Sequence, residues 1–150
     1  MAQRKLASKG KKKTARPARL EGGCYCGLVR YRINAKPLYV VHCHCGMCRR
    51  ASGAPVVTWL TVDSKNLTFT RAQPVFFSSS SRADRSFCDR CGTSLTFQYK
   101  ARRETIDVTA CSLNDPEQIT PRSHVHTASQ LSWIRMDDGL RRYKSELGSK

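Results

Sequence analysis

From residue 21 onward, the chain alternates apolar and polar residues in short runs that turn residues separate. Alternation of this kind places successive side chains on opposite faces of a β-strand. The strongest run is 54–62 (APVVTWLTV), whose branched and aromatic side chains favour strands. Further strands are predicted in runs that share the pattern: 28–33, 38–41, 66–70, 74–78, 95–99, 106–108 and 131–134.

Turn residues mark the ends of these predicted strands. The serine run 78–81 predicts a flexible loop, and the segment 114–117 (NDPE) predicts a turn that opens at most one helical turn. No internal repeat is present. We therefore expect an all-β fold of short antiparallel strands with little helix.

The N-terminal segment has a different composition. Residues 1–19 carry eight lysines and arginines, no acidic residue and no apolar periodicity, which is typical of a disordered basic arm. The folded domain is then expected to span 20–150. The arm could contact nucleic acid or another polyanion, or it could be a solvated tail that aids solubility, and the sequence leaves both readings open.

The formal net charge of +16 therefore overstates the basicity of the domain, because much of it belongs to the arm. No apolar run is long enough to span a bilayer, and no secretory signal is present. We expect a cytoplasmic protein without membrane contact. In that compartment the eight cysteines predict metal sites and not a disulfide scaffold.

Four cysteines form two pairs with ligand spacing, Cys24 with Cys26 and Cys88 with Cys91. In an extended strand, residues i and i+2 share a face, so Cys24 and Cys26 can bind one ion together. The C-x-x-C-G spacing of Cys88 and Cys91 lets a tight turn direct both sulfurs to one metal. Together the pairs predict one structural zinc bound by four thiolates.

Three more cysteines, Cys43, Cys45 and Cys48, lie within six positions. A structural zinc site needs four protein ligands, whereas a working site keeps one position open. Three thiolates make zinc a poor generator of hydroxide but a good holder of a substrate thiol. The spacing thus favours a second, catalytic zinc and thiol chemistry. Alternatively, His42 or His44 supplies a fourth ligand and the second site is structural too.

Several other residues have candidate roles. His44, between two ligands, could carry a proton in catalysis, or it could be an ordinary imidazole near the site. Arg49 and Arg50 could receive a substrate carboxylate or lie on the surface. Cys111 is unpaired and is predicted to be a buried thiol in the core. His124 and His126 could share a strand face, with a metal role as the less favoured reading.

The chain resembles the glutathione-dependent formaldehyde-activating enzyme family, which includes centromere protein V. Three motifs carry the resemblance, in order along the chain: GCYCG at 23–27, HCHCGMCRR at 42–50 and FCDRCG at 87–92. Later pieces also fit, among them 113–116 (LNDP), Pro121 with His124, and Trp133 followed by Asp138 and Tyr143.

The resemblance implies a β-tent fold with two zinc ions. It implies a structural zinc on Cys24, Cys26, Cys88 and Cys91 and a catalytic zinc on Cys43, Cys45 and Cys48, in agreement with the spacing. It also implies a carbon–sulfur lyase activity that joins formaldehyde to glutathione as S-(hydroxymethyl)glutathione.

The expected function is therefore a zinc-dependent enzyme that acts on a thiol such as glutathione and an aldehyde, or on their adduct. The alternative is a zinc-stabilised binding module whose basic arm contacts nucleic acid or another polyanion.

Overall fold

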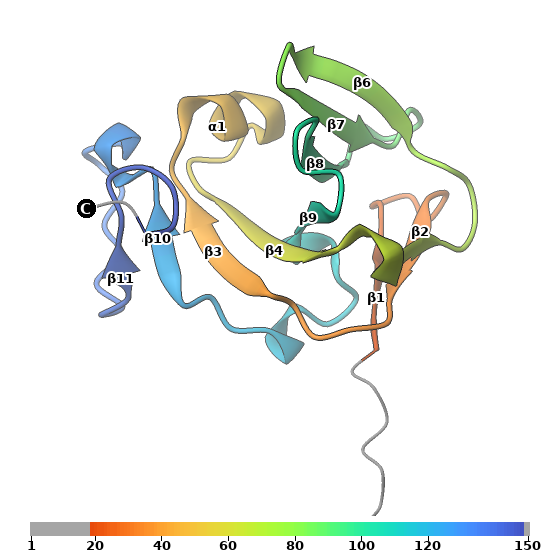
Figure 1. Cartoon of the computed structure of the whole chain (residues 1–150), viewed down its shortest axis with the longest axis horizontal. Helices are drawn as coiled ribbons and strands as arrows, with labels where there is room; N and C mark the ends of the chain where they lie inside the picture. Colours follow the sequence, from red (N-terminus) through yellow and green to blue (C-terminus); the bar gives the residue numbers. More distant parts are fainter. Residues whose placement is uncertain (1–18, 149–150) are drawn as a thin grey trace, which may run out of the picture.

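The computed structural model describes residues 19–148 (Figure 1). The strands in this part of the chain are β1 (Leu20–Gly23), β2 (Arg30–Ile33), β3 (Tyr39–Cys43), β4 (Val57–Asp63), β5 (Leu67–Phe69), β6 (Val75–Ser80), β7 (Ala83–Phe87), β8 (Ser94–Tyr99), β9 (Thr105–Thr109), β10 (Ser123–Val125) and β11 (Arg141–Arg142). The helical elements are α1 (Gly46–Ser52) and the single 3-10 turns η1 (Ser64–Asn66), η2 (Ala110–Ser112), η3 (Pro116–Gln118) and η4 (Thr127–Ser129).

The strands form two sheets. The smaller sheet has the order β1-β2-β5, and the larger one has the order β11-β10-β3-β4-β9-β8-β7-β6. The prediction of an all-β fold with little helix is confirmed. Most neighbours are antiparallel, as expected, but β10 runs parallel to both β3 and β11. In Figure 1, β10 lies beside β3, and α1 lies at the end of β3.

Strand β4 shows how alternation builds two packed faces. Leu60 and Val62 point into the main core, which they share with residues of the small sheet such as Ile33. Val57 and Trp59 point to the opposite face and belong to a second cluster that contains cysteines. Neither face of β4 is therefore an open solvent surface, and the second face carries the candidate site.

One predicted strand and one predicted loop are wrong, and the strand is the run 131–134. The run 131–134 forms no strand: the amide of Ile134 donates to the carbonyl of Leu131 in a turn, and Trp133 is 68% exposed. No neighbouring strand pairs with this run, so its branched and aromatic side chains do not form a ladder. The predicted turn at 114–117 is confirmed, because η3 begins at Pro116.

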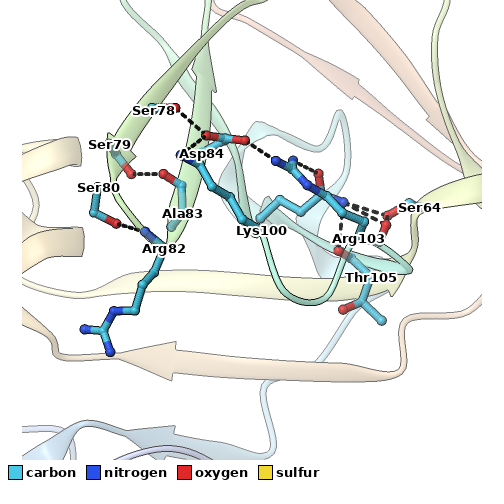
Figure 2. A network of polar contacts seen from close by, with 11 residues as sticks. Ser64, Ser78, Ser79, Ser80, Arg82, Ala83, Asp84, Lys100, Arg103 and Thr105 are labelled. Carbon is cyan, nitrogen blue, oxygen red and sulfur yellow. Dashed lines mark hydrogen bonds and ion pairs between the residues drawn. The ribbon is translucent and has the colours of Figure 1, made fainter.

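The serine run is the other error, because β6 continues through Ser80. Its hydroxyl groups bond to the partner strand: Ser78 Oγ donates to Asp84 Oδ1 at 2.9 Å, as Figure 2 shows. Arg103 and Lys100 pair with the same carboxylate at 2.5 and 3.6 Å. These interactions hold the pKa of Asp84 below its usual range, with the Arg103 hydrogen bond as the largest cause. Side-chain hydrogen bonds thus extend the hairpin where composition predicts a loop.

The predicted basic arm, residues 1–19, lies outside the described residues except for Arg19. Arg19 pairs with Glu21 at 2.5 Å at the start of β1. Its boundary with the domain, which we expect at residue 20, stays a prediction. Within residues 19–148, the helices are too short and too polar to cross a membrane.

Gly22 is required by the close packing of β1 against η2 and the neighbouring strand β2. A Cβ atom at this position would lie 2.4 Å from both the Ser112 carbonyl oxygen and the Tyr31 hydroxyl. We predict that Gly22→Ala lowers the free energy of unfolding by about 1–3 kcal/mol, the usual cost of overpacking. Gly46→Ala is the control, because its nearest contact would be Arg49 Nη2 at 3.9 Å. Chemical denaturation measures both, and equal midpoints for the two variants would contradict the prediction.

Candidate metal centre

The first cysteine cluster joins two turns that lie far apart in the chain. Cys24 and Cys26 follow β1, and Cys88 and Cys91 lie between β7 and β8. Their four Sγ atoms lie within 4.8 Å of one another, with 3.5 Å between Cys24 and Cys26 and 3.8 Å between Cys26 and Cys88. Four sulfurs around a zinc ion, with bonds of about 2.3 Å, lie about 3.8 Å apart. The donor set therefore fits a metal enclosed by four thiolates.

Neighbouring groups direct hydrogen bonds at these sulfurs. The Val29 amide donates to Cys24 Sγ at 3.2 Å, and the Thr93 hydroxyl lies 3.2 Å from Cys91 Sγ. The Thr93 hydrogen bond is the main reason that the pKa of Cys91 falls to about 5. Such donors favour the thiolate, which is the form that binds metal.

The second cluster is local and depends on the start of α1. Cys43 ends β3, Cys45 is the N-cap of α1, and Cys48 lies in its first turn. Cys45 Sγ accepts a hydrogen bond from the Cys48 amide at 3.3 Å. The three Sγ atoms lie within 4.8 Å of one another. The helix itself was not predicted, and it is this turn that brings Cys48 back to the strand end.

The three thiols cannot ionise independently. Hydrogen bonds from the Cys43 and Cys48 thiols hold the pKa of Cys45 far below its usual range. The contact with Cys45 raises the pKa of Cys43 in turn. Positive charge is therefore needed before all three become thiolates. Arg85 supplies part of it, since Nη2 lies 3.5 Å from Cys48 Sγ, and the all-sulfur donor set fits a soft divalent metal such as zinc for the rest.

This cluster has three protein donors and not four. Among residues 19–148, no histidine, cysteine, aspartate or glutamate atom joins the three sulfurs within 4.8 Å. Residues 1–18 and 149–150 contain none of these four residue types. The two clusters thus differ in the way that the sequence spacing predicts, four donors against three.

The histidines that the sequence offered as a fourth ligand have other partners. His42 Nδ1 lies 2.9 Å from Thr58 Oγ1, and His44 Nε2 lies 2.9 Å from His124 Nδ1. His124 Nε2 in turn lies 2.9 Å from a carboxylate oxygen of Asp138. The last two contacts form a chain that links the residue after β3, strand β10 and the segment before β11.

His44 is fully buried within this chain. Burial, together with the charge of His124, lowers the pKa of His44 to about 4, so the imidazole is neutral at pH 7. Its Nδ1 has no hydrogen-bond partner among the described residues. His44 is not part of the cavity wall described next, and its role as a proton carrier stays a prediction.

A cavity of about 400 Å³ opens beside the three-thiol cluster, and Cys43, Cys45 and Cys48 form part of its wall. Trp59 and Phe97 add an aromatic surface, with ring centroids 6.3 Å apart. A larger hollow of about 630 Å³ lies beside the four-thiol cluster. That cluster already has a full set of protein donors, so the smaller cavity is the one where a ligand could meet an incompletely coordinated metal.

Sequence reasoning missed the charged residues of this cavity, among them Arg85 and Asp107. Strand register gives the signal that could have found them. Asp107 is opposite Thr61 on one side and Phe97 on the other, and Phe97 is opposite Arg85. Residues directly opposite in neighbouring strands point to the same face, so this row lies on the face that carries the thiols.

The remaining candidates divide between structure and surface. Arg49 Nη1 donates to the carbonyl of His44 at 2.8 Å, which ties α1 to the strand end, and Arg50 is exposed. The prediction that Cys111 is buried is wrong: η2 turns Ala110 inward and leaves Cys111 exposed. His126 lines the cavity, but it lies beyond the end of β10 with φ of 57° and does not continue the strand face of His124.

The fold and the two clusters define a small cysteine-rich β protein with two groups of thiols that could hold metal ions. Residues 19–129 match the family of glutathione-dependent formaldehyde-activating enzymes, and the chain belongs to this family.

Two curated relatives are similar over most of their length. A Halomonas elongata protein that carries the name of this family is 27% identical over 127 residues, which cover 79% of this chain and 81% of the relative. A Schizosaccharomyces pombe protein named as an uncharacterized lyase is 27% identical over 100 residues, which cover 67% of this chain and 72% of the relative.

A solved structure supports the fold. The crystal structure of a Rhodobacter sphaeroides protein is 25% identical, with a TM-score of 0.54 over 68% of this chain and 92% of that one. Neither this structure nor the relatives point to nucleic acid as a partner.

Because the clusters differ, loss of a cysteine from each is predicted to have a different effect on the number of bound metal ions and on the fold. If both clusters hold a metal ion, Cys43→Ser is expected to lose one of the two ions while the fold is retained, because its cluster is local. Cys88→Ser is expected to lose the other ion and to unfold, because it opens the link between two distant turns. Cys111→Ser, with an exposed thiol, should change neither. Metal analysis with circular dichroism checks this, and a folded Cys88→Ser protein that retains two ions would refute it.

Proposed function

We propose that this chain is a zinc-dependent carbon–sulfur lyase that joins a thiol to an aldehyde and cleaves the adduct in reverse. Glutathione and formaldehyde are the proposed substrates, in keeping with the family. The observation that carries the proposal is the three-thiol cluster, which lies in a cavity wall and has no fourth protein donor.

Zinc is the proposed metal at both clusters. Cys24, Cys26, Cys88 and Cys91 would hold a structural ion, and Cys43, Cys45 and Cys48 a catalytic one. Bound there, the catalytic ion supplies a position at which a substrate thiol is held as its thiolate at neutral pH. In the reaction the thiol sulfur bonds to the aldehyde carbon, and the carbonyl oxygen gains a proton. Cleavage breaks the same carbon–sulfur bond and returns the proton.

The surrounding residues support this chemistry in two ways. Arg85 is only 5% exposed and contacts Cys48, so its charge offsets part of the negative charge of the thiolates. Its guanidinium carbon lies 4.7 Å from the centre of the Phe97 ring, which holds the cation beside the cluster. Trp59 and Phe97 also keep part of the wall apolar, and a partly dry wall strengthens the electrostatic interactions at the reacting sulfur.

The carbonyl oxygen needs a proton donor in the forward reaction. His44 is the residue that the sequence favours, and its chain through His124 to Asp138 could carry a proton. Because His44 is buried outside the cavity wall, a water molecule would have to connect it to the substrate. The hypothesis of a nucleic-acid-binding arm concerns residues outside the described part of the chain, and no contact among residues 19–148 supports it.

The test is exchange spectroscopy on the zinc-loaded protein. With glutathione and formaldehyde present, we expect the NMR exchange between free and adduct glutathione to be faster than in buffer. Cys45→Ser should abolish the acceleration, since it removes a ligand of the proposed catalytic ion, while Cys111→Ser should retain it. Wild-type exchange equal to that of the buffer reaction would exclude the glutathione reaction.

A further inference from the structure

Asp107 is an acid in the cavity that the proposed reaction does not use. Only one of its carboxylate oxygens is hydrogen-bonded: Oδ1 accepts from the Thr61 hydroxyl at 2.5 Å. The other oxygen, Oδ2, has no hydrogen-bond partner among the described residues and is not fully buried. Because Asp107 lines the cavity, this oxygen is accessible from it. Among residues 19–148, no cation lies within ion-pair distance of Asp107. Asp107, which is more buried than the exposed Glu104 of the same wall, therefore presents one carboxylate oxygen without a partner from the described residues.

The two arginines near Asp107 contact other groups. Arg85 belongs to the same row of the sheet, but its long side chain reaches back to Cys48, where Nη2 lies 3.5 Å from Sγ. Arg102 lies at the cavity wall and pairs with Glu146 at 3.8 Å. Arg85 Nη1 is buried without a hydrogen-bond partner among the described residues, and neither arginine forms an ion pair with Asp107.

Register shows how far Asp107 lies from the thiols. Cys43 is opposite Val57, and Asp107 is opposite Thr61, four residues further along β4. Four strand residues rise about 13 Å, which is too far for the short Asp107 side chain to reach an atom bound to a sulfur at the cluster. This separation excludes direct proton transfer by Asp107 and suits recognition of the far end of a longer ligand.

We infer that Asp107 binds the ammonium group of the thiol substrate, so that the cavity selects an extended aminothiol of peptide size. The inference rests on the proposed function. A thiol held at the cluster would extend along β4, with its amine at the free oxygen of Asp107. In glutathione the thiol belongs to the middle residue, and the γ-linked glutamyl residue carries the amine several covalent bonds further out, so an extended ligand can reach from the cluster toward Asp107. Small thiols without a distant amine would lack this contact.

The ionisation of Asp107 is compatible with this role. Burial raises its pKa to about 6, against the opposing effects of the Thr61 hydrogen bond and of Arg102 and Arg85. The group is therefore mostly a carboxylate at pH 7, and a buried carboxylate without a counter-charge is stabilised by a bound cation.

The experiment compares two ligands that differ only in the amine. Glutathione has an α-amino group at its far end, and glutaryl-cysteinylglycine lacks that amine but keeps the thiol and the carboxylates. We expect the zinc-loaded wild-type protein to bind glutathione roughly 10- to 100-fold more tightly, as for a hydrogen bond to a charged group. Isothermal titration calorimetry measures both affinities.

Asp107→Asn keeps an acceptor for Thr61 and should lose the discrimination, with glutathione binding as weakly as the deaminated ligand. Asp63→Asn is the matched control: it removes a charge from the same strand as Thr61, at a side chain that makes no capping hydrogen bond and does not line the cavity. It should keep the wild-type preference. Thermal unfolding of each variant checks that the fold is intact.

The outcomes separate the two proposals. Equal wild-type affinities for both ligands overturn the role of Asp107 and leave the thiol reaction standing, and so does an Asp107→Asn protein that keeps the preference or loses affinity for both ligands equally. If the wild-type protein binds neither thiol, the proposed function fails, and the ammonium site fails with it. Because the wild-type comparison uses no variant, it decides the question even if Asp107→Asn does not fold.

Discussion

The arrangement of the two sheets depends on the convergence of four thiols from distant turns. Besides this cluster, the main core joins the two sheets, since it contains Leu20 of β1 and Leu60 of β4, and the Asn114 amide donates to the Glu21 carbonyl at 2.8 Å. Four sulfurs within 4.8 Å of one another repel once they ionise. A metal turns that repulsion into a link between chain segments, so the free energy of metal binding becomes free energy of folding.

The three-thiol cluster is built in the opposite way. Its sulfurs come from six consecutive residues, at the end of β3 and the start of α1, so binding a metal there closes no long loop and links no separate sheets. Such a site adds little to the fold and is free to open on a cavity. In the proposed function the two clusters therefore have different tasks, and the distance along the chain between the ligands decides which task each cluster has.

Cysteine spacing and strand alternation predicted most of the architecture because both are local rules with strict geometry. The all-β class and the convergence of both cysteine sets follow from them. The failures come from tertiary context. The run 131–134 has strand composition but no partner strand, whereas the run 78–80 has loop composition but a partner that accepts its hydrogen bonds. Cys111 follows a strand of alternating apolar residues, and the turn at η2 rotates it outward. In none of these three cases does the residue type alone determine the conformation.

The alternation pattern did not identify the polar wall of the cavity. Ile106 and Val108 alternate with Asp107, and that pattern usually means that the polar residue faces water. In this fold the other face of β9 does not face open solvent, because the row from Thr61 to Arg85 lines the cavity together with residues of α1 and of the C-terminal segment. Burying a charged side chain on a second packed face costs free energy. A protein that retains such a charge with an oxygen still open is arranged to meet a ligand there, and alternation alone cannot distinguish that face from a solvent surface.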